Sequence, residues 1–395
     1  MKSSVNPYRY AEEVFGDHFT GRQEELKTLI SRLESGINVS LIAPRRTGKT
    51  SLIAEATRRL EARKPKAAIA RINAMLCVSL ADLAGALAEA AYQSAGRGYS
   101  SRGIADFIKR LRVSPTVTLD AKGNPTFSFE PRLCASDARR SFESVFEIMS
   151  EVANRRVATI VLDEFQHVLS LGEEVSGFFK ALADRYPKVG LVLAGSDRHM
   201  MESLIAEKTA PLYGMTEPIY LGPIPSPDMV RFVVTRAAQS SKSMDEESAN
   251  YIVSLAGPLP NDIQRLAFEA WTLAEGPIDK LVVNLGMKRA SVHEYSLFEQ
   301  RLSDLSVNQR RVLQALVIRP ETEPCSSEFV HRSGVANASS VLNGLRVLEA
   351  SQIIRRREGA WVVDNPFLRF ALAPARFEVE FSTTISAKPA VKRKT

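Results

Sequence analysis

Gly48, Lys49 and Thr50 stand together at the end of a short polar stretch, between a strand-like and a helix-like segment. The stretch begins at Ala43 and has the spacing of a Walker A loop, except that Ala43 stands where a first glycine is usual. In such a loop the backbone N–H groups and the following helix N-terminus converge on one spot and bind phosphate. The other residues predicted to form this nucleotide-binding loop are Pro44, Arg45, Arg46, Thr47 and Ser51.

Three residues of this loop have distinct expected roles. Gly48 lets the backbone approach the phosphates, Lys49 reaches the β- and γ-phosphates as a positive charge, and the Thr50 hydroxyl is a ligand of Mg²⁺. Ala43 is compatible with the loop if its φ is negative. The expected ligands are therefore ATP and Mg²⁺. The alternative is that Gly-Lys-Thr occurs by chance in an ordinary loop.

Two adjacent carboxylates, Asp163 and Glu164, directly follow the apolar run Thr159–Leu162. A strand end beside a phosphate-binding loop is where a magnesium-organising aspartate has to lie. We expect Asp163 to hold a magnesium-bound water and Glu164 to polarise the attacking water as general base. The alternative is a surface pair that caps the next helix. Ser196 follows another apolar run and could contact the γ-phosphate or the attacking water, but an ordinary turn or N-cap serine explains it nearly as well.

Strands that alternate with helices have to position these residues. Apolar strand candidates cover residues 37–42, 67–72, 157–162 and 189–194. Near-continuous apolar runs are typical of parallel strands buried on both faces. We therefore predict an α/β core with a parallel sheet over residues 1–222. Within it, residues 113–130 alternate about a turn sequence and predict a β-hairpin insertion.

From Ser226 onward the strand patterns stop and helical patterns follow one another. The last of them predict two separate helices, near residues 278–287 and 292–302. The change from strand to helical patterns predicts an all-helical domain over residues 223–300, followed by a winged-helix domain over residues 301–380. Residues 381–395 are polar and basic, and we expect this tail to be disordered.

The third helix expected in the winged helix, residues 337–350, places Val341, Leu342, Leu345 and Leu348 toward the core. The residues left facing outward, as on a recognition helix, are Ser339, Ser340, Asn343 and Arg346. A two-stranded wing follows, and its tip carries Arg355, Arg356 and Arg357, which could contact phosphates or a minor groove. Winged helices also serve as protein-docking modules, so a protein partner is the alternative to DNA.

Charge and composition bear on the kind of partner and the compartment. Residues 301–395 hold 15 lysines and arginines against 9 aspartates and glutamates, so almost all of the formal net charge of +7 lies there. This excess indicates an anionic partner, and a solvated basic tail is the alternative. The three cysteines are scattered, and no run of 18 apolar residues occurs. We therefore expect a cytoplasmic protein with reduced thiols and no membrane span.

The segment Phe19–Leu26 resembles the F-x-G-R-x-x-E-L motif near the start of AAA+ and STAND ATPases. The chain is similar over nearly its whole length to the archaeal-type P-loop ATPase family of that assemblage, which also occurs in bacteria. The segments that carry the resemblance are Pro44–Ile53, Val161–Gln166, Leu193–Leu204, Pro211–Gly214 and Leu259–Leu266. The resemblance implies an ATPase core, a helical lid and a C-terminal winged helix, with ATP and Mg²⁺ bound between core and lid.

The same resemblance implies roles for several further residues. Gly21 and Arg22 would lie near the adenine or the loop that admits it, and Pro260 in the lid would close over the base. Arg265 is a candidate second sensor, with a surface arginine as the alternative. Met215 stands where relatives commonly have an arginine after Pro-Leu-Tyr-Gly, which puts trans-acting arginine chemistry in doubt.

These expectations combine into one functional prediction. The protein is predicted to be a slow, Mg²⁺-dependent ATPase whose nucleotide state controls a winged helix that binds duplex DNA. The alternative is a nucleotide-loaded scaffold with little turnover, whose winged helix docks a protein partner. A homo-oligomer is compatible with either prediction.

Overall fold

The computed structural model describes residues 5–63, 65–95, 115–119, 125–129, 135–172, 174–357 and 359–373. The chain divides into two compact units. One unit is Ala11–Ile224, and the other combines Met1–Tyr10 with Pro225–Thr395. Within the described residues, no helix is both long and apolar enough to cross a membrane.

The N-terminal segment was assigned to the ATPase core in the sequence analysis, whereas the structure groups it with the helical unit. The Asn6 side chain donates a hydrogen bond to the Phe268 carbonyl (3.0 Å). The Tyr8 hydroxyl, which is buried, donates to the Val233 carbonyl (2.8 Å). These polar contacts attach the segment before Ala11 to the helices of the second unit.

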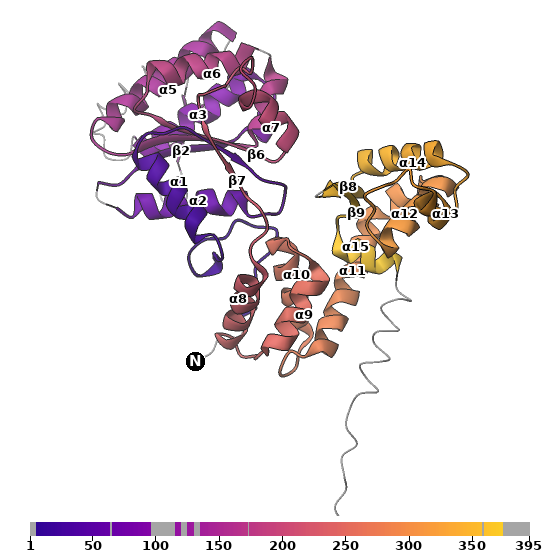
Figure 1. Ribbon diagram of the computed structural model, residues 1–395. Coiled ribbons are helices and arrows are strands. Elements are labelled where there is room, and N and C mark those ends of the chain that lie inside the picture. Colours follow the sequence, from indigo (N-terminus) through magenta and orange to yellow (C-terminus); the bar gives the residue numbers. More distant parts are fainter. Residues whose placement is uncertain are drawn as a thin grey trace, which may run out of the picture. The chain divides into compact units, whose positions relative to one another are not determined.

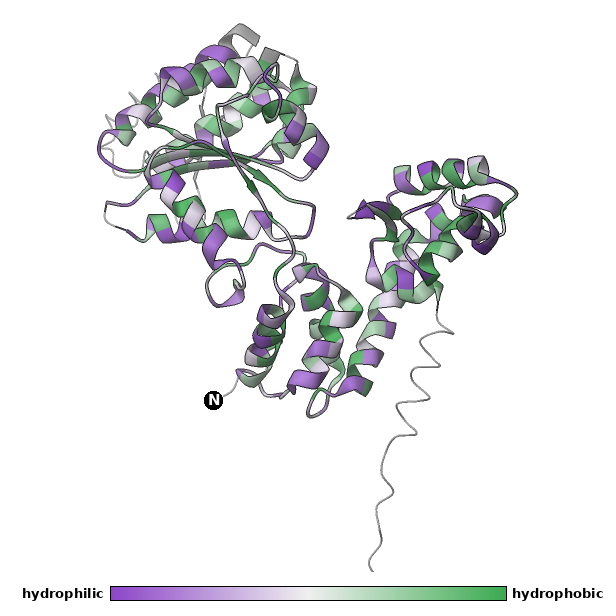
Figure 2. Ribbon diagram, in the orientation of Figure 1, coloured by the Kyte–Doolittle hydropathy of each residue, from purple (hydrophilic) through white to green (hydrophobic). Residues whose placement is uncertain are grey.

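A five-stranded parallel sheet forms the middle of the first unit (Figure 1), in the order β2-β5-β6-β1-β7. Its strands are β1 (Val39–Ile42), β2 (Ala68–Asn73), β5 (Ala158–Asp163), β6 (Gly190–Gly195) and β7 (Glu217–Tyr220). Every residue of β1, β5 and β6 is buried, and Figure 2 shows these strands as a strongly apolar part of the unit. The predicted α/β core with a parallel sheet is confirmed.

Helices cover both faces of this sheet (Figure 1). On one face lie α1 (Gln23–Glu34) and α2 (Lys49–Glu61), and on the other lie α3 (Leu80–Ala95), α5 (Ala135–Ala153) and α6 (Glu174–Arg185). The remaining elements are η1 (Gly16–His18), η2 (Ala74–Leu76), η3 (Phe165–Leu171) and α7 (Arg198–Ile205). Strands β3 (Pro115–Leu119) and β4 (Pro125–Phe129) pair antiparallel at the place of the expected hairpin.

The second unit begins, after the N-terminal segment, with helices only. They are α8 (Ser226–Ala238), α9 (Glu246–Ala256), α10 (Pro260–Leu273) and α11 (Lys280–Ser303). Asp245 and Asp279 cap α9 and α11 by accepting hydrogen bonds from backbone N–H groups of their first turns. The sequence patterns predicted two separate helices near residues 278–287 and 292–302. The structure has a single helix of 24 residues in their place.

The winged helix follows α11. It consists of α12 (Val307–Ile318), α13 (Ser327–Ser333), α14 (Ala338–Ala350), β8 (Ile354–Arg357), β9 (Ala360–Val363) and α15 (Pro366–Leu372). Val341, Leu345 and Leu348 are buried as predicted, but Leu342 is 44% exposed. The expectation for Leu342 was wrong because it lies about 100° around the helix from Val341, outside the buried stripe. The expected basic tail, residues 381–395, lies outside the described residues.

Candidate nucleotide and magnesium site

The loop between β1 and α2 has a fixed turn immediately before the helix. Gly48, the N-cap of α2, has a φ of +90°, a conformation that other residues adopt only with strain. The Thr47 hydroxyl donates to the Pro44 carbonyl (2.6 Å), and the Ala43 amide donates to the Gly195 carbonyl (3.2 Å). Ala43 does not have a positive φ, so alanine is compatible with this position. The first N–H groups of α2 have no partner within the helix and can bind an anion.

Lys49 lies between the two predicted carboxylates. Its ammonium nitrogen is 3.1 Å from an oxygen of Asp163 and 3.3 Å from an oxygen of Glu164. The Thr50 hydroxyl donates to the other oxygen of Asp163 (3.1 Å). The structure thus brings together four residues from two segments, one that follows β1 and one at the end of β5, although β6 lies between these two strands. Lys49 is 5% exposed and Asp163 is 3% exposed. Charges buried this deeply are costly, and functional sites are where such clusters concentrate.

Glu164 is held by a second set of contacts at the carboxyl end of β6. The Ser196 hydroxyl donates to Glu164 Oε2 (2.8 Å), and Gln166 Nε2 donates to the same oxygen. Burial alone would raise the pKa of Glu164, but the Lys49 charge and these hydrogen bonds outweigh it and lower the pKa below 4.5. Glu164 is therefore ionised at neutral pH. Glu164 is the residue before η3, and its side chain makes no capping hydrogen bond. The alternative that it caps the next helix would require such a bond.

Arg22 supports the loop from inside the core. It is 2% exposed, and its guanidinium donates to the Thr47 carbonyl (2.9 Å) and the Gly222 carbonyl (2.6 Å). Its burial lowers the pKa of the guanidinium, and the ion pair with Glu25 at 3.0 Å opposes this shift. The resemblance placed Arg22 near the adenine or the loop that admits it. The structure shows its guanidinium hydrogen-bonded to a carbonyl of the loop between β1 and α2. Gly21, just before it, has a φ of +67°.

The remaining predicted loop residues differ in exposure. Pro44, Arg45 and Arg46 are exposed. The Ser51 hydroxyl, in contrast, is buried and accepts a hydrogen bond from the Val14 amide (3.1 Å). Ser51 therefore fastens the segment before α1 onto α2.

Sequence reasoning missed two polar residues of this site. Arg71 on β2 lies 2.6 Å from Glu13 and 3.7 Å from Asp163, so a second cation reaches the predicted magnesium-organising carboxylate. Gln166 contacts both Glu164 and Ser196. One sequence feature could have pointed to Arg71 as a site residue: it is a single charged residue inside an otherwise apolar strand. Gln166 lies in the segment that carries the family resemblance, where no role was assigned to it.

Pro260 and Arg265 belong to the second unit. Pro260 is the buried first residue of α10. Arg265 forms an ion pair with Glu294 of α11, and its guanidinium carbon lies 4.5 Å from the ring centroid of Phe367 in α15. The side chain is 14% exposed, so the alternative of a surface arginine is wrong. In the first unit, Met215 is partly buried against the hydrophobic core.

The predicted outward face of α14 is exposed at Ser339, Asn343 and Arg346, and partly exposed at Ser340. The N-cap residue Asn337 accepts hydrogen bonds from the Ser339 hydroxyl (3.0 Å) and the Ser340 amide (2.9 Å). The two serines therefore take part in capping the helix. Asn343 and Arg346 have no such local role and remain available to a ligand.

The three wing arginines are not equivalent. Arg355 and Arg357 lie 2.5 Å and 3.1 Å from the same oxygen of Asp364. The guanidinium carbon of Arg356 instead lies 5.9 Å from the ring centroid of Trp361. The Asp364 carboxylate offsets the charge of Arg355 and Arg357, so contacts within the wing account for two of the three arginines.

Comparison with known protein families finds a match in the C-terminal part of the chain. Residues 296–373 match a family model described as a probable winged helix domain. A search of curated protein sequences finds no match. Among solved structures, a Walker-type ATPase of Pyrococcus abyssi is 16% identical, with a TM-score of 0.60 over 93% of this chain and 99% of that chain.

A second solved structure, the ORC2 protein of Aeropyrum pernix in ADPNP–ADP complexes, is 15% identical. It has a TM-score of 0.50 over 92% of this chain and 95% of that chain. This chain has the fold of the P-loop ATPases that end in a winged helix. The resemblance noted from the sequence is thereby confirmed for the fold, whereas identities this low do not transfer an activity or a partner.

Proposed function

We propose that this P-loop protein binds ATP with Mg²⁺ and hydrolyses it slowly. The observation that carries the proposal is the buried Lys49 ammonium, held between Asp163 and Glu164 directly after the Gly48 turn. A buried cation beside a helix N-terminus is suited to phosphate oxygens. Packing alone does not call for this cluster, because apolar side chains of similar volume would fill the space at lower cost.

The residues present also fit a magnesium ion. The Thr50 hydroxyl and the Asp163 carboxylate are 3.1 Å apart, and both are oxygen ligands of the kind that Mg²⁺ prefers. Such an ion, when bound, neutralises charge on the phosphate groups. We propose that Thr50 and Asp163 hold it, the latter through a water.

In this proposal Lys49 exchanges its carboxylate partners for phosphate oxygens when ATP binds. Glu164, ionised because its pKa is lowered, accepts the proton of the attacking water. Ser196 and Gln166 fix the position of Glu164 Oε2. Among the described residues, Glu164 Oε1 accepts a hydrogen bond from Lys49 alone, so this oxygen becomes free to accept the proton once Lys49 has turned to the phosphates.

For the rest of the chain we retain the division into core, helical lid and winged helix, with Gly21 and the lid residue Pro260 as further nucleotide contacts. The nucleotide state would control the winged helix, whose exposed Asn343 and Arg346 would read duplex DNA. The exposed Leu342 on the same helix instead favours the second candidate, a docked protein. Measuring ATP turnover with and without DNA discriminates the two candidates.

Replacing Lys49 by alanine tests the nucleotide site. The change removes the side-chain cation aimed at the phosphates, so ATP affinity should fall by at least about tenfold, or about 1.4 kcal/mol. Titration calorimetry with Mg-ATP measures this loss. The matched control is Lys27→Ala, which removes an exposed lysine of α1 in the same unit and should leave affinity unchanged. Equal affinity of the Lys49→Ala variant and the wild type would overturn the proposal.

A further inference from the structure

Helix α11 is apolar on two opposite sides. One side carries Val283, Met287 and Ala290, which are buried against the rest of the unit. The other side carries large apolar side chains with high exposed fractions. They are Leu281 (49%), Leu285 (47%), Val292 (65%) and Tyr295 (40%). A helix of a soluble protein normally has one apolar stripe, so the second stripe calls for an explanation.

The exposed stripe has the spacing of a coiled-coil seam. Its exposed positions alternate in steps of four and three residues through Leu281, Leu285, Lys288, Val292, Tyr295 and Glu299. The next step reaches Leu302, which is partly buried against the winged-helix core. This repeat keeps successive side chains on one line of the helix surface and allows them to interdigitate with those of a second helix. The segment Leu281–Leu302 is about 32 Å long at the rise of an α-helix.

The two charged residues of the seam select both the partner and its direction. Lys288 and Glu299 are exposed, and among the described residues neither has an ion-pair or hydrogen-bond partner. They are about 16 Å apart along the helix axis, too far to pair within one chain. In a parallel pair of identical helices, each would face its own copy and repel it. In an antiparallel pair they can face each other.

One antiparallel register pairs six of the seven seam positions and leaves Leu281 facing residue 306, beyond the end of α11. With a two-fold axis between residues 293 and 294, Lys288 faces Glu299 of the second copy, and Val292 faces Tyr295 of the second copy. The next layer pairs Leu285 with Leu302 of the second copy. Each of these contacts occurs twice, as two-fold symmetry requires. The stripe is therefore complementary to itself.

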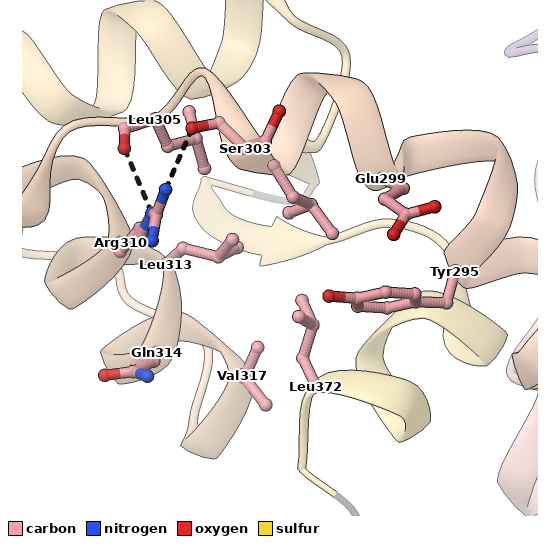
Figure 3. Close-up of a pocket in the computed structure, with 10 residues that line it drawn as sticks. Tyr295, Glu299, Ser303, Leu305, Arg310, Leu313, Gln314, Val317 and Leu372 are labelled. Atoms are coloured by element: carbon pink, nitrogen blue, oxygen red, sulfur yellow. Dashed lines mark hydrogen bonds between the residues drawn. The ribbon is translucent and has the colours of Figure 1, made fainter.

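A pocket of about 350 Å³ lies beside the C-terminal half of the seam (Figure 3). Tyr295, Glu299 and Leu302 line it from α11, and Val317 of α12 and Leu372 of α15 complete its apolar wall. The Arg310 guanidinium at its edge is engaged with the carbonyls of Ser303 and Leu305. In the antiparallel register, Leu285 of the second copy faces Leu302 and would reach this pocket.

We propose that the exposed seam of α11 is a homodimerisation surface, in which the α11 helices of two copies pack antiparallel. This surface is independent of the proposed nucleotide site. A seam of this length gives a modest interface, so the dimer should dissociate on dilution.

Charge reversal tests the register as well as the dimer. Lys288→Glu and Glu299→Lys each place like charges face to face twice, so each should weaken dimerisation by at least about tenfold. The double variant restores opposite charges and should dimerise within about threefold of the wild type. Sedimentation velocity on the full chain at concentrations from about 1 to about 100 μM measures these constants.

Matched controls are Lys27→Glu and Glu24→Lys, which reverse exposed charges on α1 and should leave dimerisation unchanged. A second variant, Leu285→Asp, should abolish the dimer while leaving the thermal melt of the monomer unchanged, because the side chain is half-exposed. A wild-type chain that is monomeric at every concentration would overturn the proposal. The proposal would also be overturned if the double variant did not recover the dimerisation that the single variants lose.

Discussion

Replacing Glu164 by glutamine should separate nucleotide binding from hydrolysis. Glutamine keeps the size of the side chain and one oxygen that can accept a hydrogen bond. In the wild type the Ser196 hydroxyl lies 2.8 Å and the Lys49 ammonium 3.3 Å from the carboxylate oxygens, so either donor can still bond to the amide oxygen. It cannot accept a proton from water. Loss of a positioned general base costs about 10² to 10⁴ in rate, equivalent to about 3 to 5 kcal/mol of transition-state free energy. ATP affinity should be retained or increase, because one anion that competes with phosphate for Lys49 is removed.

The pH dependence of the wild type provides a second measure of the same residue. Because the pKa of Glu164 is lowered below 4.5, its carboxylate is charged above that pH and becomes neutral as the pH falls through the lowered pKa. Turnover should therefore be flat between about pH 6 and pH 8, as far as this base controls it.

The assay for Glu164→Gln is phosphate release at saturating Mg-ATP, paired with an ATP titration of the same preparation. The exposed Glu24 on α1 gives a matched control, because Glu24→Gln makes the same chemical change outside the site. Turnover of Glu164→Gln within a few-fold of the wild-type rate would show that Glu164 is not the base.

Two further changes test other parts of the chain. The hydrogen bond from Arg58 has the largest effect on the Glu55 carboxylate. Together with the other hydrogen bonds it lowers the pKa of Glu55 from 4.5 to about 2, although burial opposes the charge. Its ionisation therefore contributes up to about 3 kcal/mol of stability, present above about pH 4.5 and lost as the pH falls toward 2. Glu55→Gln should lower the melting temperature at pH 7 and do so less at pH 3.5, and equal losses at both would contradict this reasoning. In the wing, Arg356→Ala should weaken duplex-DNA binding and reduce the log–log salt slope by about one, measured by fluorescence anisotropy. The control Arg319→Ala removes an exposed arginine at the end of α12, and a chain ending at Phe381 measures what the basic tail contributes. Absence of DNA binding at about 50 mM salt in both chain lengths would favour the protein-docking alternative.

The predicted site residues that the structure brings into contact are those encoded within short segments. Gly48, Lys49 and Thr50 follow one another in a loop whose spacing is set by the shape of a phosphate group, and Asp163 directly ends an apolar strand. Arg71 was missed because its approach to Asp163 depends on β2 lying beside β5. Strand adjacency is a property of the folded sheet and leaves no local pattern in the sequence.

The fold was predictable where burial leaves a regular pattern in the sequence, either a near-continuous apolar run as in β5 or a single apolar stripe as in α14. Strand β7 was not predicted because it lies at the sheet edge, and three of its four residues, including Tyr220, are exposed. Helix α11 was predicted as two shorter helices because its apolar residues fall on two opposite sides, which weakens the helical period. The exposed apolar side chains of α11 therefore account both for the weak helical period in the sequence and for the exposed seam in the structure.

The packing around Gly195 suggests how a change at Glu164 could reach the rest of the core. A Cβ at Gly195 would lie 2.4 Å from Met201 of α7 and 2.9 Å from Gln166 Oε1, so the end of β6, Gln166 and α7 are in tight contact. Gln166 and the neighbouring Ser196 also donate to Glu164. If Glu164 gives up these bonds when it activates water, both donors must find new partners, because buried polar groups rarely remain unpaired. Close packing then requires the start of α7 to adjust with them. A Ser196→Ala variant tests this coupling: hydrogen exchange in α7 should respond to nucleotide in the wild type and respond less in the variant. An equal response in both would show that the signal does not pass through Ser196.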